Sequence, residues 1–278
     1  MEKAFSQFSN EANNCNTVDA AISIYTRAKA ILGTSTRLEL MKDEIRVVLD
    51  GMLSGSYSNK AILQSVLVDK KPFVFKYPTR PEFASSICRD YEFCEQLKDA
   101  NSGILPTGIV DYQRLKIVQI DGNEVIGSIS KFYCFSLNQL TRPLPLWYVL
   151  DIGKRIVTTL DKIHTLQYVV NDIKPENLYM DTDGNVDIAD FGGATANGDK
   201  LVEITTEYYP NDLSDDRFAY YTGDWFCLIN TVLDLLGQHK ICSTTKIRSF
   251  LTEAIKGYSE EAEFWRLISS KLNANVGD

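Results

Sequence analysis

The apolar residues of this chain gather, from about residue 45, in short runs separated by turn residues. The runs EIRVVLDGML and KAILQSVLV flank the turn-rich stretch SGSYSN, and KPFVFKYP follows after the connection Asp69-Lys70. Runs of this length between turn residues predict a meander of β-strands. The stretch RLKIVQIDGNEVIGSISKF adds two strands around Asp121-Gly122, a strong hairpin signal. We therefore predict an antiparallel sheet here.

Helical spacing interrupts this strand-rich part once and also precedes it. In ASSICRDYEFCEQLKDA, one stripe carries Ile87, Tyr91, Cys94 and Leu97 at the spacing of an amphipathic helix. Near the N-terminus, TVDAAISIYTRAKAIL at 17–32 has the same spacing and ends before Gly33. We expect this first helix to dock onto the main domain rather than to bind a partner.

Beyond Leu140 the pattern becomes mainly helical. PLWYVLDIGKRIVTTLDKIHTL predicts a long amphipathic helix, and YTGDWFCLINTVLDLLG is apolar enough for a buried one. Two further helices are predicted at about 243–257 and 259–273. A strand-rich half followed by a helical half predicts an α+β fold of two lobes. We place a partly helical extension at 1–44, one lobe at 45–131 and the other at 132–278, with the join near 131–138.

Composition narrows the classes of function. The 278 residues carry a formal net charge of −8, so nonspecific attraction to nucleic acid or to an anionic membrane is not expected. The six cysteines form no CxxC pair, which argues against a zinc site and for reduced thiols. The polar N-terminus carries no signal-peptide hydrophobic region, and no apolar run reaches about 18 residues. We expect a cytoplasmic or otherwise intracellular protein, inside a host cell if it is viral or an effector.

A polar group interrupts an apolar frame in YVVNDIKPENLYM at 168–180. Asp172, Lys174 and Asn177 have the spacing D-x-K-x-x-N, and Pro175 stops the preceding helix from continuing. Eighteen residues after Asp172, Asp190 follows a short strand in DIADFGGA. Carboxylate and amide oxygens hold Mg²⁺ together with substrate phosphates, so Asn177 and Asp190 are candidate metal ligands. Asp172 is positioned to accept a hydroxyl proton, while Lys174 neutralises a transferring phosphoryl group.

These two motifs, NDIKPENLYM followed by DFG, resemble the catalytic loop and magnesium-binding motif of eukaryotic protein kinases. The resemblance implies a bilobal fold, ATP and Mg²⁺ as cofactors, and a protein substrate. The KPEN segment is similar to that of Ser/Thr kinases, so phosphate transfer to Ser or Thr hydroxyls is expected. The short region after Asp224 implies abbreviated C-terminal helices.

The resemblance also implies an ATP-binding set in the first lobe. Lys76, in FVFK, resembles the lysine that holds the α- and β-phosphates, and its acidic partner is either Asp90 or Glu92. We favour Asp90, because the position of Leu97 seven residues later matches the family. The glycine-rich loop is weakly matched by Gly55 and Ser56. The remaining expected nucleotide contacts are Lys131, Tyr133, Asp190 and Tyr179, the last of which narrows the pocket.

Other positions resemble the family or depart from it. Asp224, in TGDWFCL, resembles the buried aspartate that anchors the catalytic loop through backbone amides, and His164 is expected to be structural. The family's His-Arg pair is replaced by Val170-Asn171, which removes the usual receiver of an activation-loop phosphate. We therefore expect activity independent of phosphorylation at Thr205 or Thr206. Two alternatives stay open: a pseudokinase scaffold, and a kinase-fold enzyme acting on a small molecule.

Overall fold

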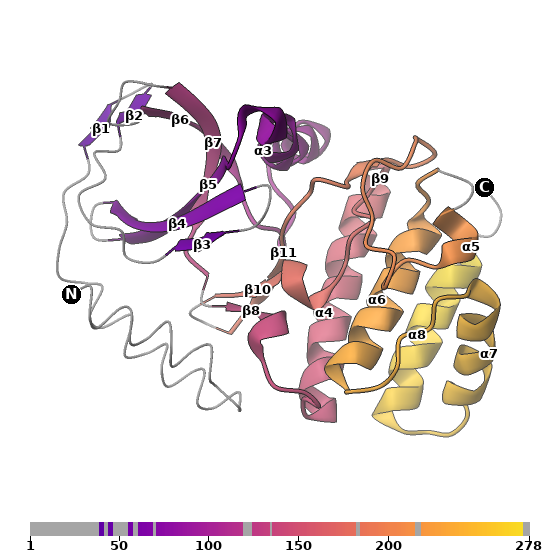
Figure 1. Cartoon of the computed structure of the whole chain (residues 1–278). Coiled ribbons are helices and arrows are strands. Elements are labelled where there is room, and N and C mark those ends of the chain that lie inside the picture. Colours follow the sequence, from indigo (N-terminus) through magenta and orange to yellow (C-terminus); the bar gives the residue numbers. More distant parts are fainter. Residues whose placement is uncertain are drawn as a thin grey trace.

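The computed structural model describes residues 39–41, 44–46, 55–57, 61–68, 71–118, 124–133, 135–181, 184–214 and 218–274. The predicted helix at 17–32 and the turn at Asp121-Gly122 lie outside these residues. The chain forms a strand-rich lobe that carries helix α3 and a helical lobe that contains α4, α6 and α8 (Figure 1). The predicted α+β, bilobal architecture is confirmed.

The strand-rich lobe is built on a five-stranded sheet in the order β3-β4-β5-β7-β6, with every neighbouring pair antiparallel. Its strands are β3 (Gly55–Tyr57), β4 (Ala61–Val68), β5 (Lys71–Pro78), β6 (Gln113–Val118) and β7 (Glu124–Lys131). The predicted hairpin is observed as the β6–β7 pair, in which Val118 lies opposite Glu124. The sheet ends at Lys131, where the join was predicted.

Two strands lie where the sequence indicated none. Gly55–Tyr57, within the turn-rich SGSYSN, pairs with β4 so that Gly55 lies opposite Gln64. Strand β1 (Glu39–Met41) falls inside the proposed extension 1–44 and pairs with β2 (Glu44–Arg46). Pairing with a neighbour overrides weak local propensity in both places, because β-propensity depends strongly on context.

Helix α3 (Ala84–Ala100) follows a short 3-10 turn, η1 (Pro81–Phe83), and packs on β5, β6 and β7. Its predicted stripe is buried, with Ile87, Tyr91, Cys94 and Leu97 at 7% exposure or less. Asp90 lies on the same buried side of the helix and is fully buried. The helix therefore carries a carboxylate into the interior beside the sheet.

The helical lobe packs α4, α6, α7 and α8 around one apolar core. Its helices are α4 (Leu146–Thr165), α5 (Asn211–Ser214), α6 (Tyr221–Leu235), α7 (Thr244–Ala254) and α8 (Glu260–Ala274). Helix α6 is buried on nearly every side, as its apolar sequence predicts. The predicted helices at 243–257 and 259–273 correspond to α7 and α8. Within the described part of the chain, no helix combines the length and apolarity that crossing a membrane requires.

Short strands hold the loops between the lobes. Strands β8 (Phe135–Ser136), β10 (Leu178–Met180) and β11 (Val186–Ile188) form one small sheet, with β10 in the middle. Strands β9 (Tyr168–Val169) and β12 (Thr195–Ala196) form another. Two 3-10 turns, η2 (Leu137–Gln139) and η3 (Pro175–Asn177), complete these connections. The segments that contain Asp172 and Asp190 are thus fixed at both ends by strand pairing.

Gly153 of α4 lies against the Phe264 ring of α8. A Cβ added there would lie 2.7 Å from two ring carbons of Phe264, which is buried and stacked edge-on against Trp265. We predict that Gly153→Val lowers the free energy of unfolding by roughly 1–3 kcal/mol through overpacking, measured by urea denaturation. Lys154→Val, at the exposed neighbouring position, is the control for helix propensity. Equal stabilities of the two variants would show that Phe264 moves aside.

Candidate active site

A buried lysine joins the two lobes through ion pairs. Lys76 on β5 places its Nζ 2.7 Å from Asp90 Oδ2 on α3 and 3.0 Å from Asp190 Oδ1, which follows β11. The lysine is 8% exposed, whereas the Asp190 side chain is 45% exposed. Asp90, not Glu92, is therefore the helical partner of Lys76, and Glu92 points to solvent. The group presents one solvent-accessible carboxylate beside a buried ammonium.

The charges in this group perturb one another. Burial works to lower the pKa of Lys76, but the carboxylates of Asp190 and Asp90 oppose it and hold the pKa well above its usual value. Burial raises the pKa of Asp90 from 3.8 to about 6, against the opposing effect of Lys76. Lys76 is therefore a permanent cation, and the Asp90 carboxyl titrates in mildly acidic solution.

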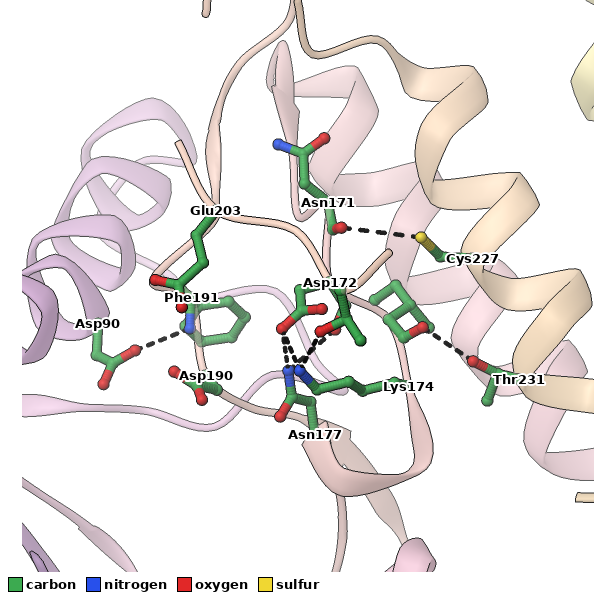
Figure 2. Close-up of polar contacts among 12 residues, drawn as sticks. Asp90, Asn171, Asp172, Lys174, Asn177, Asp190, Phe191, Glu203, Cys227 and Thr231 are labelled. Atoms are coloured by element: carbon green, nitrogen blue, oxygen red, sulfur yellow. Dashed lines mark hydrogen bonds and ion pairs between the residues drawn. The ribbon is translucent and has the colours of Figure 1, made fainter. Parts of the chain in front are cut away.

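The catalytic-loop candidates converge on one carboxylate. Lys174 Nζ donates to Asp172 Oδ2 at 2.7 Å, and Asn177 Nδ2 donates to the same oxygen at 3.0 Å. Figure 2 shows these three side chains together, with Asp190 next to them. Pro175 begins η3, whose single turn brings Asn177 back toward Asp172. The other oxygen, Asp172 Oδ1, is buried and accepts no hydrogen bond from the described residues.

Asp224, in the first turn of α6, holds the catalytic loop through its backbone amides. Its carboxylate accepts hydrogen bonds from Val170 N at 3.0 Å and Asn171 N at 2.6 Å, and it bonds His164 Nε2 at 2.9 Å. The predicted anchoring by backbone amides is therefore observed, and His164 is one of the partners that make burial of this acid tolerable. Thr231 Oγ1 adds a hydrogen bond to Ile173 O at 2.9 Å.

The Asp190 loop is held from both lobes. Asp190 adopts φ 59°, a left-handed conformation that is uncommon outside glycine. On one side Ala189 N donates to Asn177 O at 2.8 Å, and on the other Phe191 N donates to Asp90 Oδ1 at 2.8 Å. The ring of Phe191 packs against Phe93 of α3 at 4.9 Å. The Ala189–Asn177 hydrogen bond brings the turn that carries Asn177 next to the segment that carries Asp190.

The donor atoms at this place suit magnesium. Mg²⁺ prefers oxygen ligands and binds protein through one or two side chains plus substrate phosphates. Asp190 supplies a partly exposed carboxylate. Asn177 uses its amide nitrogen on Asp172, so its carbonyl oxygen is the atom available for coordination. The donor atoms of the predicted metal pair therefore fit Mg²⁺ in their chemistry.

Gly55, Ser56 and Tyr179 are three of the other predicted nucleotide contacts. Strand register places Ser56 in the same row as Lys76, with Leu63 between them, and Gly55 is its neighbour on β3. Tyr179 on β10 is half-buried, and its pKa is raised to about 12 by burial. The Lys76 ammonium is among the charges that act on this phenol. Gly55 and Ser56 thus lie two strands away from Lys76 in the same sheet, and Tyr179 lies within the electrostatic influence of the lysine.

Lys131 and Tyr133 contact acidic side chains. Lys131 Nζ lies 3.0 Å from both Asp181 Oδ2 and Asp187 Oδ2, and the Tyr133 hydroxyl donates to Asp187 Oδ2 at 2.7 Å. These contacts connect the join to the β10–β11 hairpin. The Lys131 side chain remains half-exposed beside these acids. The expected nucleotide contacts of Lys131 and Tyr133 stay a prediction.

Two contacts of the site were missed in the sequence. Lys174 Nζ also donates to Thr205 Oγ1 at 2.6 Å, which links the catalytic loop to a residue considered only as a phosphorylation site. Tyr112 is buried with its ring 5.7 Å from Lys76 Nζ. No local signal in GIVDYQ indicates that contact, because it depends on how α3 and the sheet pack.

The chain matches a family model described as a protein kinase domain over residues 131–274. The chain belongs to the protein kinase family. The match begins at the end of β7, so it does not cover Lys76 and Asp90.

Similar curated kinases match over short stretches. The chain is 37% identical over 68 residues to 3-phosphoinositide-dependent protein kinase 1 of Arabidopsis thaliana, covering 24% of this chain and 13% of that protein. It is 34% identical over 83 residues to cAMP-dependent protein kinase catalytic subunit 3 of Drosophila melanogaster, covering 29% and 14%. It is 26% identical over 122 residues to human serine/threonine-protein kinase Sgk1, covering 42% and 26%. The kinase thus spans about a quarter or less of these relatives.

The buried carboxyl of Asp90 predicts a pH dependence of kinase stability. Its pKa is about 6 in the folded chain against an ordinary 3.8, so folding takes up a proton between these values. The stability that Asp90 contributes is therefore present below about pH 4 and is lost as pH rises through about 6. In urea denaturation, the unfolding free energy of wild type minus that of Asp90→Asn should fall across this window.

Glu92→Gln is the matched control, since Glu92 is exposed on the same helix while Asp90 carries the ion pair. This variant retains Asp90 and should keep the wild-type pH profile. A difference between wild type and Asp90→Asn that is flat from pH 4 to pH 7 would contradict the burial of a titrating Asp90.

The Asp224 network predicts a large loss of stability when its carboxylate is removed. Asp224→Ala leaves the buried Val170 and Asn171 amides without their acceptor, at a cost of roughly 3 kcal/mol or more. Asp151→Ala removes an exposed acid that pairs with Arg155 on α4 and should cost less than about 1 kcal/mol. Chemical denaturation of both variants measures the contrast. Similar losses for the two would mean that the loop amides are satisfied elsewhere.

Proposed function

We propose that this chain is a serine/threonine protein kinase that uses ATP and Mg²⁺, and that it acts without phosphorylation of its activation segment. The proposal rests on two neighbouring groups of charged and polar side chains. In one, Lys76 pairs with Asp90 and Asp190, and in the other, Asp172 accepts hydrogen bonds from Lys174 and Asn177. The first group suits binding of polyphosphate and metal. The second suits activation of a hydroxyl.

Each side chain has a step in the transfer. Lys76 holds the α- and β-phosphates of ATP, and Asp90 keeps the lysine oriented. Asp172 accepts the proton of the substrate hydroxyl as that oxygen forms a bond to the γ-phosphorus and the bond to the β–γ bridging oxygen breaks. Mg²⁺, when held by Asn177 and Asp190, supplies neutralisation of phosphate charge. The products are ADP and a phosphorylated protein.

The preference for Ser and Thr hydroxyls rests on the lysine of the loop. Lys174 lies between Asp172 Oδ2 and Thr205 Oγ1, at 2.7 and 2.6 Å, where a transferring phosphoryl group would need a cation. Several of the curated relatives are named as serine/threonine-protein kinases, which supports the same preference. Both observations support a protein substrate with a Ser or Thr acceptor.

Independence from phosphorylation rests on contacts that the activation segment already makes. Strand β12 pairs with β9, and the Tyr208 hydroxyl donates to Asp234 Oδ2 at 2.6 Å. Thr205 is engaged by Lys174, so a phosphate on Thr205 would set negative charge beside Asp172. Asn171 stands where the resemblance expects an arginine. Thr206, which is exposed, is therefore the residue to test for a phosphorylation requirement.

The test is transfer of labelled phosphate from ATP by phosphatase-treated protein, with Mg²⁺ and both acidic and basic protein acceptors. Asp172→Asn should lower kcat by about 100-fold or more, because it removes the proton acceptor. Thr206→Ala should leave kcat within about twofold, and the labelled residues should be phosphoserine or phosphothreonine. ATP binding without transfer to any acceptor would favour the pseudokinase scaffold, and phosphotyrosine would contradict the Ser/Thr assignment.

A further inference from the structure

Asn171 connects the catalytic loop to the loop that follows Asp190. Its side chain is fully buried, and Nδ2 donates to Gly193 O at 3.0 Å. Its main chain is fixed as well: the amide donates to Asp224 Oδ1 at 2.6 Å, and the carbonyl accepts from Cys227 Sγ at 3.8 Å. Figure 2 shows the Asn171 amide directed away from the Asp172 carboxylate that follows it in the chain. Asn171 therefore faces Gly193 while Asp172 faces Lys174.

Gly193 lies in the loop that follows Asp190, against the backbone of Glu203 further along the chain. A Cβ at Gly193 would lie 2.4 Å from Glu203 O, so the two backbone segments are in direct contact there. Three residues earlier, Asp190 contacts Lys76. The hydrogen bond from Asn171 thus holds this loop at Gly193, three residues after Asp190, the proposed metal ligand.

The residue type suits this place for two reasons. Asn171 has φ 65°, a left-handed conformation that asparagine adopts more readily than most residues. A buried carbonyl such as Gly193 O needs a donor, which an amide supplies and a carboxylate of the same shape does not. Aspartate, alanine and β-branched residues each fail one of these requirements.

We propose that Asn171 is a positioning residue for phosphoryl transfer: its amide sets the Asp190 loop relative to Asp172. This inference rests on the proposed kinase activity. The mechanism needs Asp172 and the metal ligand Asp190 in fixed register, although they lie on separate loops. Asn171 is adjacent in the chain to Asp172 and hydrogen-bonded to Gly193, so it transmits the position of one loop to the other.

The test compares Asn171→Gly with Gln167→Gly. Glycine keeps the left-handed backbone and removes only the side chain. Gln167 has φ 68° and is exposed at the end of α4, so the same change there is the matched control. Asn171→Asp is the second variant, since it keeps shape and removes the donor. All are assayed well below their melting temperatures.

We expect Asn171→Gly and Asn171→Asp to lower kcat by about 10- to 100-fold, the size of effect that a misplacement near 1 Å produces. The KM for ATP should change less, because Lys76 and Asp90 are untouched. Amide hydrogen exchange within 191–196 should become at least about fivefold faster in both variants if loss of the Gly193 contact opens the loop. Gln167→Gly should alter neither quantity.

The two readouts separate the outcomes. Unchanged kcat and unchanged exchange in both Asn171 variants overturn the inference, and so does a loss of stability with wild-type kcat. Absence of transfer by the wild type overturns the proposed function and the catalytic part of this inference. The exchange measurement then still decides whether Asn171 holds the loop.

Discussion

The buried ion pair between Lys76 and Asp90 is the interaction on which the site depends. Taking two charges out of water is costly, and an isolated pair of this kind is weak evidence for stability. Here the pair is extended, because Lys76 also reaches Asp190 and Asp90 also accepts the Phe191 amide. One ammonium between two carboxylates carries a net negative charge, which favours a further cation at the exposed oxygens of Asp190. The pair therefore joins the sheet, α3 and the Asp190 loop into one electrostatic unit.

Asp224 is the buried acid that organises the catalytic loop in the helical lobe. It enters the core on α6 and is compensated by two backbone amides of the catalytic loop and by His164. Those amides belong to Val170 and Asn171, which immediately precede Asp172. Both buried acids thus serve to hold loops rather than to react. Asn171 lies between the two systems, with its backbone on Asp224 and its side chain on the Asp190 loop.

Local pattern predicted most of the fold, and motif spacing predicted the centre of the site. The stripe of α3, the apolar α6 and the D-x-K-x-x-N group are short-range signals, and each is placed by the structure as expected. Strand β3 was not predicted, because its Gly and Ser have low β-propensity and form a strand here only by pairing with β4. The ion pairs of Lys131 with Asp181 and Asp187 were not predicted, because these acids lie about 50 residues away in the chain. Contacts of that range depend on packing, which a single sequence does not display.

We propose that Lys76, Asp190 and Asn177 together form a site for a metal-bound polyphosphate. Calorimetric titration of ATP into the purified chain, with and without Mg²⁺, tests it most directly. We expect Mg²⁺ to tighten ATP binding by at least about tenfold in the wild type, a coupling of about 1.4 kcal/mol. Asp190→Asn should abolish this effect of the metal. Equal ATP affinity with and without Mg²⁺ in the wild type would show that these residues do not hold a metal-bound polyphosphate.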